Sequence, residues 1–175
     1  MSKLNLLILD ANVIIYLHDI GIWDSFIKTC DIHLPDTVVE EAAFFDDRDE
    51  TRHYIDLSDD ISKARINTFT VPLSELVEFQ NQFDTLYFDQ LDPGELEALA
   101  YLCKSPNELL ISSGDAIVYR VLGRLNKGNQ GISLEEILTK VGLKQSHLPR
   151  QFTKLFRESL THQGFQDLMA GRGLK

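Results

Sequence analysis

The sequence lacks long hydrophobic runs, and this absence excludes one class of protein. No run of about 18 apolar residues occurs, so we expect no membrane-spanning helix. Met1-Ser2-Lys3 leads directly into an apolar segment that contains an aspartate, which is unlike a secretory signal peptide. These patterns predict a protein without a membrane partner.

Cysteines and histidines are few and scattered. Cys30 and Cys103 have no metal-ligand spacing, so we expect two small buried thiols in a reducing cytoplasm rather than a disulfide. None of the five histidines pairs with another at a zinc-site spacing. His18 and His33 have no nearby serine or cysteine that would make a nucleophilic pair. The sequence therefore predicts a cytoplasmic protein without a zinc site and without a Ser-His or Cys-His nucleophile.

Positive charge is scarce in the first two thirds of the chain. Residues 1–115 carry seven Lys and Arg against 23 Asp and Glu, a balance of −16. Residues 116–175 carry ten Lys and Arg against four Asp and Glu, a balance of +6. Two interpretations of this asymmetry stay open. The basic part binds an anionic partner, or it forms helices with a solvated basic face.

The chain of 175 residues is long enough for one domain with a core of its own. Strand-like and helix-like segments alternate, which predicts an α/β protein with a parallel sheet and crossover helices. The predicted strands are 4–10, 31–34, 66–71 and 109–111. The predicted helices are 12–30 with a break near Gly21, 36–45, 74–83, 92–103, 115–125, 133–142, 149–162 and 165–169. The highly charged segment 46–64 predicts a loop.

Two aspartates follow predicted strands directly. Asp10 ends the apolar run 4–10, and Asp115 ends the segment 109–114. Neighbouring parallel strands end at the same edge of a sheet, so both carboxylates are expected at one edge. Asn12 is placed to orient Asp10, and Ser113 to add a hydroxyl. The structural alternative is that each aspartate only caps the following helix.

Two glutamates follow on predicted helices. Glu41 shares the inward stripe with Val38 and Phe45, whereas Glu40 points about 100° away. Glu95 lies on the apolar side of its helix, although Asp92 and Glu95 also fit a capping box. Glu97, by contrast, is predicted to face solvent with Tyr101 and Lys104.

Four carboxylates at one crevice would repel each other unless a cation neutralised them. Magnesium prefers oxygen ligands and is held by one or two carboxylates together with waters and phosphate oxygens. A cluster of this kind activates water for attack at phosphorus. We therefore predict a divalent metal site at Asp10, Glu41, Glu95 and Asp115.

Four segments in order resemble the PIN-domain nucleases. They are 7–14 (LILDANVI), 38–42 (VVEEA), 94–99 (GELEAL) and 110–115 (LISSGD). The order and spacing agree over residues 4–142. The resemblance implies a three-layer α/β/α fold with a central parallel sheet of four to five strands. It also implies Mg²⁺- or Mn²⁺-dependent cleavage of RNA.

Carried over by position, the resemblance makes Asp10, Glu41, Glu95 and Asp115 both metal ligands and catalytic residues, supported by Asn12 and Ser113. Many small bacterial members of the family are toxins paired with a small antitoxin, and members often form homodimers. This chain departs from the compact pattern in its acidic segment 46–64 and in the helices after residue 142. We therefore expect a nuclease domain at 1–142 and a helical extension at 143–175.

Basic residues after Asp115 are the expected RNA contacts, which would be sensitive to salt and largely independent of sequence. They are Arg120, Arg124, Lys127, Lys144, Arg150, Lys154 and Arg157.

Three other functions stay open on the sequence alone. One is a phosphatase with Asp10 as nucleophile, although Asn12 stands where such sites have a second aspartate. Another is a non-catalytic PIN-like module that binds a protein partner through its acidic face. The third is a PIN nuclease of RNA maturation or DNA repair rather than a toxin.

Overall fold

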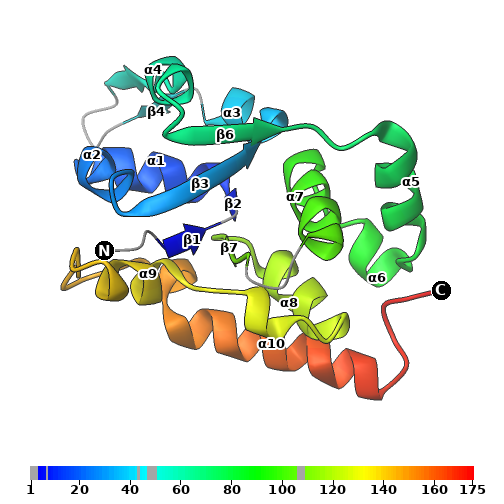
Figure 1. The fold of residues 1–175 in the computed structure, drawn as a ribbon. Coiled ribbons are helices and arrows are strands. Elements are labelled where there is room, and N and C mark those ends of the chain that lie inside the picture. Colours follow the sequence, from blue (N-terminus) through cyan, green and yellow to red (C-terminus); the bar gives the residue numbers. More distant parts are fainter. Residues whose placement is uncertain (1–3, 7, 43, 47–50, 106–108) are drawn as a thin grey trace.

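Short parallel strands and helices alternate along the chain, so the predicted α/β class is confirmed (Figure 1). The computed structural model describes residues 4–6, 8–42, 44–46, 51–105 and 109–175. The first predicted strand is present as β1 (Leu4–Leu6) and β2 (Ile8–Leu9). It is followed by β3 (Cys30–Pro35), β6 (Ile66–Phe69) and β7 (Ile111–Ser112).

Hydrogen bonds divide these strands into two parallel ladders. One ladder has the order β1-β3-β6, and the other pairs β2 with β7. In the second ladder Ile8 lies opposite Ile111 and Leu9 opposite Ser112. Within the described residues, no single ladder contains the predicted four to five strands. The pairing of β2 with β7 nevertheless brings the two aspartate-bearing strand ends together.

The predicted helix over 12–30 forms α1 (Ala11–Asp19) and α2 (Trp23–Phe26), with the break near Gly21 as predicted. Gly21 has a φ of +69°, a left-handed conformation that suits glycine. The helix predicted over 36–45 is shorter, because α3 (Asp36–Glu41) ends at Glu41.

The prediction of a plain loop over 46–64 is wrong. β4 (Phe44–Asp46) pairs antiparallel with β5 (Arg52–Tyr54), and α4 (Ser58–Ser62) follows. Residues 47–50 lie outside the described part of the chain. One aspartate of this segment stabilises the fold. Asp60 accepts a hydrogen bond of 2.9 Å from Trp23 Nε1 and forms an ion pair of 2.8 Å with Arg65.

The second half is mostly helical, and the helices predicted over 74–83, 92–103, 115–125 and 133–142 lie close to their predicted positions. Two short helices, at 85–88 and 128–130, were not predicted. The segment predicted as two pieces after residue 149 is a short 3-10 turn followed by one continuous helix. The elements are α5 (Leu73–Asn81), α6 (Thr85–Phe88), α7 (Pro93–Lys104), α8 (Ala116–Arg124), η1 (Gly128–Gln130), α9 (Leu134–Lys140), η2 (Arg150–Phe152) and α10 (Lys154–Met169).

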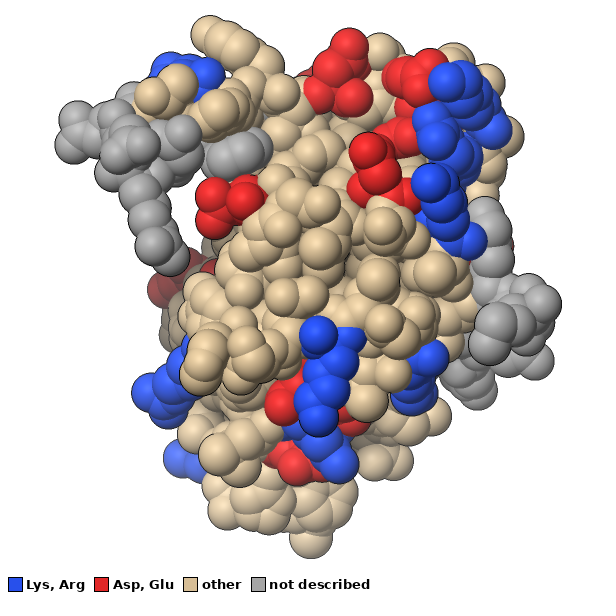
Figure 2. Space-filling view, turned by 90° about the vertical axis from the view of Figure 1, so that its left-hand side faces the viewer, with Lys and Arg blue, Asp and Glu red and all other residues tan. Residues whose placement is uncertain are grey.

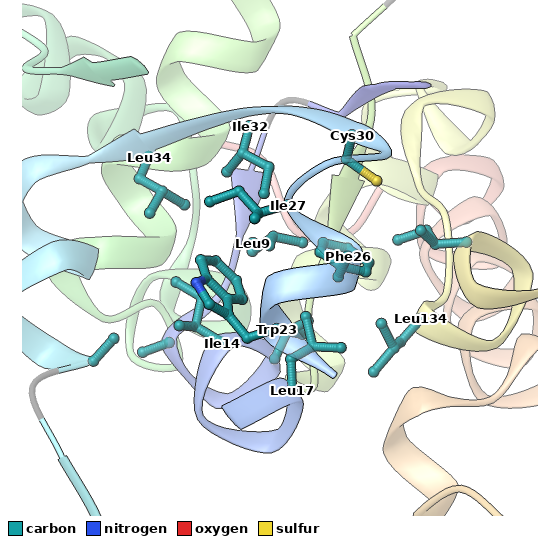
Figure 3. Packing of buried hydrophobic residues seen from close by; sticks show 14 of the residues in the cluster. Leu9, Ile14, Leu17, Trp23, Phe26, Ile27, Cys30, Ile32, Leu34 and Leu134 are labelled. Atoms are coloured by element: carbon teal, nitrogen blue, oxygen red, sulfur yellow. The ribbon is translucent and has the colours of Figure 1, made fainter. Parts of the chain in front are cut away.

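Buried apolar side chains form two clusters. Figure 3 shows the first, where Leu9, Ile14 and Phe26 pack below the β3 residue Ile32 and beside Trp23. The second cluster joins α7 and α8 to Phe83 and Tyr87. Cys30 is fully buried, Cys103 is half-buried, and both are free thiols. The expected burial therefore holds for Cys30 and only partly for Cys103.

The C-terminal helix α10 lies along α8 (Figure 1). A side chain at Gly123 would meet the backbone oxygen of Thr161, and one at Gly164 would meet that of Arg120. The two helices therefore approach as closely as glycine permits. In the described part of the chain, no helix combines the length and apolarity that a membrane crossing requires.

Candidate functional site

Asp10 lies at the junction of β2 and α1, and its carboxylate caps the helix. Its Oδ1 accepts a hydrogen bond of 3.3 Å from the backbone N–H of Asn12. Two more donors reach Oδ2 from the turn after β7, namely Ser113 Oγ at 3.1 Å and the Gly114 N–H at 3.1 Å. Asp10 therefore ties together two strand ends about one hundred residues apart in sequence, besides serving as a cap.

Asn12 connects the two predicted aspartates. Its Nδ2 donates to Asp10 Oδ2 at 3.4 Å and to Asp115 Oδ2 at 3.3 Å. Asp115 occupies the N-cap position of α8 but makes no side-chain capping bond there. Its carboxylate is thus turned toward Asp10 instead of toward its own helix. Ser113 Oγ also accepts a hydrogen bond of 2.9 Å from the Asp115 N–H.

The pKa of Asp10 reflects this crowding. Burial raises it above the usual range, and the charge of Asp115 raises it further, while the hydrogen bonds from Gly114 and Asn12 oppose the rise. A carboxylate that is buried beside another carboxylate is stabilised either by a proton or by a cation.

Glu95 has the strongest perturbation in the cluster. Its N–H donates to Asp92 Oδ1 at 2.8 Å, and its Oε2 accepts from the Asp92 N–H at 3.1 Å, which completes a capping box. The side chain is only 7% exposed. Burial and the charges of Asp92, Asp115 and Asp10 raise its pKa to about 8, although the Asp92 hydrogen bond lowers it. Glu95 is therefore both the predicted cap and a buried acid at the crevice.

Glu41 ends α3 above the first turn of α7. A Cβ at Gly94 would lie 3.0 Å from Glu41 Oε2, so glycine leaves room for this carboxylate. Desolvation raises the pKa of Glu41, and the charges of Asp92 and Asp10 raise it further. The prediction that Glu41 belongs to the inward stripe of its helix is wrong, because Glu41 is exposed. Glu41 nevertheless lies next to Asp10 and Glu95 at the rim of a small cavity.

A small cavity lies among these side chains. Asp10, Glu41, Asp92, Glu95 and Ser113 line it. Its volume of about 10 Å³ is comparable to the space that holds one water molecule. Asp92 is the residue that sequence reasoning assigned only to a cap, and it lines the cavity through the side chain that caps α7. Asp115 opens instead onto a neighbouring larger cavity beside Asn12.

The donor set fits a hard divalent cation. All of its side chains offer oxygen, and the Asp10–Asp115 pair alone provides the two carboxylates with which Mg²⁺ is commonly held. Among the described residues, no three His, Cys, Asp or Glu side chains already stand at positions that would hold one ion together. The arrangement therefore fits a site of two carboxylates completed by water, with Glu95 and Glu41 at its edge.

Glu97 corrects the sequence-based prediction that it faces solvent. It is 3% exposed, and it accepts hydrogen bonds from Thr37 Oγ1 at 2.8 Å and from the Val71 N–H at 2.7 Å. The side chain thus joins α7 to the start of α3 and to the end of β6. Glu97 therefore has a structural role. The sequence could have indicated this role only if the burial of its partners Thr37 and Val71 had been known.

Several basic residues predicted to contact RNA are engaged within the fold. Arg120 pairs with Asp167 at 2.8 Å, Arg157 with Glu136 at 2.8 Å, and buried Arg124 donates to the backbone oxygen of Arg172. Figure 2 shows one face, where basic side chains form separate groups, some directly beside acidic ones. The basic balance of the C-terminal part therefore serves internal pairing to a large extent.

Four predicted basic contacts remain. Lys127 donates to Gln130 Oε1 at 3.4 Å, and Lys154 pairs with Glu158 at 3.6 Å on the surface. Lys144 and Arg150 are exposed and form no salt bridge with any described residue. Of the seven predicted contacts, Arg150, Lys144 and Lys154 are thus the side chains most available to a partner.

Comparison with known proteins returned no match from family models, from curated proteins or from solved structures.

Proposed function

We propose that this protein is a divalent-metal-dependent endoribonuclease of the PIN type. The single observation that carries the proposal is the convergence of the four motif acids. Asp10, Asp115, Glu95 and Glu41 come from four separate segments. The charge of Asp10 raises the pKa of both Glu41 and Glu95, and the charge of Asp115 raises the pKa of Asp10 and Glu95. The carboxylates in such a cluster repel one another, and a bound cation would neutralise that repulsion. The cluster therefore favours a cation-binding site.

The proposal assigns each residue a task. Asp10 and Asp115 would hold Mg²⁺ or Mn²⁺, and Asn12 fixes their relative orientation through its two hydrogen bonds. Glu95 and Glu41 add carboxylate oxygens on the cavity side. When bound, the ion would supply Lewis-acid stabilisation of charge at phosphorus and would lower the pKa of a water. Ser113 holds Asp10 Oδ2 in place at 3.1 Å.

The fold supports the same proposal. β1 and β2 are separated by one position in sequence, and they belong to ladders β1-β3-β6 and β2-β7. All pairings in both ladders are parallel. We propose that they act as one central sheet of five strands, with Asp10 and Asp115 at its C-terminal edge, where α/β proteins place their ligands.

RNA would approach from the side of the exposed cations. Lys144, Arg150 and Lys154 lie in the C-terminal part, and Arg150 directly precedes Gln151 and Phe152, which line the cavity beside Asp115. We propose that these three residues contact the phosphate backbone, whereas Arg120, Arg124 and Arg157 maintain the fold. An antitoxin or a second copy of the chain as partner remains a proposal from the family resemblance.

The experiment is incubation of labelled single-stranded RNA with the purified protein and Mn²⁺ or Mg²⁺. We expect cleavage by the wild type and a loss of about 100-fold or more in Asp10→Asn, because removal of a charge-stabilising group in an active site has effects of this order. Asparagine caps helices as well as aspartate does, so the variant keeps α1.

The matched control is Asp24→Asn, which removes one exposed carboxylate from α2. Asp24 lines neither the small cavity nor the larger one beside Asn12. Equal cleavage by wild type and Asp10→Asn would refute the site. No cleavage by any of the three with either ion would favour a non-catalytic module.

A further inference from the structure

A second cavity adjoins the acid cluster and contains chemistry of a different kind. Its volume is about 390 Å³, within the range of small-molecule sites. It lies between α1 and η2, and it shares Asn12 and Asp115 with the site described above. A group bound in it would therefore lie beside Asp115 and beside Asn12, which links Asp115 to Asp10.

The C-terminal extension builds one wall of this cavity. A Cβ at Gly114 would lie 3.1 Å from the Phe152 ring and 3.5 Å from Gln151 Cγ, so η2 rests on the turn between Ser113 and Asp115. Phe152 contacts the Tyr16 ring of α1 with centroids 4.9 Å apart. The extension is thus part of the site rather than an attachment beside it.

Two contacts hold that wall in position. The backbone N–H of Lys154 donates to Glu135 at 2.7 Å, and Arg157 makes two hydrogen bonds to Glu136, at 2.8 and 3.0 Å. Both acids belong to α9, whose apolar side chains join the main core. The cavity is therefore preformed, which lowers the entropic cost of binding.

The lining excludes some ligands and favours others. Asp19 and Asp115 line the cavity, and among the described residues no lysine or arginine does, so a phosphate group is disfavoured there. Tyr16, Phe152 and neighbouring apolar residues offer aromatic and aliphatic surface, while Asn12 and Gln151 offer amides. A flat, uncharged group with N–H donors satisfies these conditions, and a nucleobase is such a group.

We propose that this cavity binds one unpaired nucleobase of the RNA, adjacent to the phosphodiester that the acid cluster cleaves. This rests on the proposed function, since the site shares Asn12 and Asp115. Guanine suits it best, because its neighbouring N1–H and N2–H groups can both donate to one carboxylate, that of Asp19. Uracil suits it least, because carbonyl oxygens flank its single N–H and would face that carboxylate.

The test is saturation-transfer NMR with guanosine, adenosine, cytidine and uridine, which carry no phosphate and so need no metal. We expect guanosine to bind most tightly and uridine least. Asp19→Asn and Gln151→Ala should each weaken guanosine binding about five- to tenfold, the effect of one lost hydrogen bond or more. Asp24→Asn and Gln163→Ala are matched controls on exposed positions outside the cavity, and they should bind guanosine as the wild type does.

Cleavage assays separate this proposal from the proposed function. RNAs that differ only in the base beside the cleaved bond should be cut with a preference for guanine that Asp19→Asn reduces. Cleavage without any base preference, together with no nucleoside binding, would refute the base site and leave the nuclease standing. Guanosine binding that Asp19→Asn weakens, without cleavage, would support the base site and refute the nuclease. Equal binding of all four nucleosides, or equal binding by the variants, would overturn the base site.

Discussion

Glu95 illustrates how one side chain serves the fold and the candidate site together. It completes the capping box of α7 with Asp92, and it is buried beside other acids. In the metal-free protein, the folded state holds a proton on Glu95 that the unfolded chain has already released, because the folded pKa is about 8 and the ordinary value is 4.5. Because of Glu95, the free energy of unfolding falls as the pH rises from 4.5 to about 8.

Replacing Glu95 with glutamine should flatten this dependence. Glutamine keeps an oxygen that accepts the Asp92 N–H bond and cannot ionise. In EDTA at pH 8, we expect Glu95→Gln to have a free energy of unfolding about 1–3 kcal/mol above the wild type, with little difference at pH 4. Urea denaturation at both pH values measures this.

Glu78→Gln, on the exposed surface of α5, is the matched control and should show no such change. Equal stability of Glu95→Gln and wild type at pH 8 would show that Glu95 is not held protonated by its surroundings.

Single residues were predictable from the sequence where local geometry decides their position. The strand ends placed Asp10 and Asp115 at one edge. The apolar side of its helix indicated the burial of Glu95, and the capping box indicated its position in the first turn. Glu97 was not predictable, because its hydrogen-bond partners Thr37 and Val71 come from distant segments. Helix periodicity also misplaced Glu41, since α3 ends at that residue and its side chain reaches over Gly94 at the rim.

At the scale of elements, the crossing of α8 and α10 depends on glycine. Gly123 and Gly164 each face the backbone of the opposite helix with no room for a Cβ. An alanine at either position would force the helices apart, and overpacking of this kind costs about 1–3 kcal/mol. The intrinsic helix preference of alanine over glycine, about 1 kcal/mol, acts in the opposite direction.

We expect Gly164→Ala to lower the free energy of unfolding by about 1–2 kcal/mol, because backbone oxygen atoms cannot rotate away as side chains do. Thermal and urea denaturation at neutral pH measure the change. Gln163→Ala, an exposed position next to it on α10, should be neutral or slightly stabilising. A Gly164→Ala variant as stable as Gln163→Ala would contradict the close packing.

Elements were predictable where periodicity and capping agree, as in α7 and α9, which both begin with a capping box. The hairpin β4–β5 was not predictable, because strands of three residues are too short to show the alternation of a half-buried sheet. The sequence pattern predicted one helix from residue 149 to 162 and did not separate η2 from α10. In the structure Thr153 caps α10, because its hydroxyl oxygen accepts a hydrogen bond of 3.3 Å from the Phe156 N–H. These short elements form through tertiary contacts rather than through local preference.

At the scale of the whole molecule, the C-terminal part is built into the rest by polar contacts as well as by packing. Buried Asp167 of α10 accepts hydrogen bonds from Tyr87 of α6 at 2.7 Å and from Arg120 of α8 at 2.8 Å. Although burial alone would raise the pKa of Asp167, the hydrogen bonds from Arg120 and Tyr87 lower it overall. Much of the charge asymmetry therefore holds the fold together. Asp10, Glu41, Glu95 and Asp115, by contrast, form no salt bridge with any described residue.

Calorimetric titration of Mn²⁺ tests the central claim, that these acids form a cation site. We expect one binding event at pH 7 that releases protons, because the pKa of Glu95 is about 8. Buffers of different ionisation enthalpy count the protons. Asp10→Asn should weaken binding at least about tenfold, and Asp24→Asn should not. No binding by the wild type, or equal affinity in Asp10→Asn, would contradict the account.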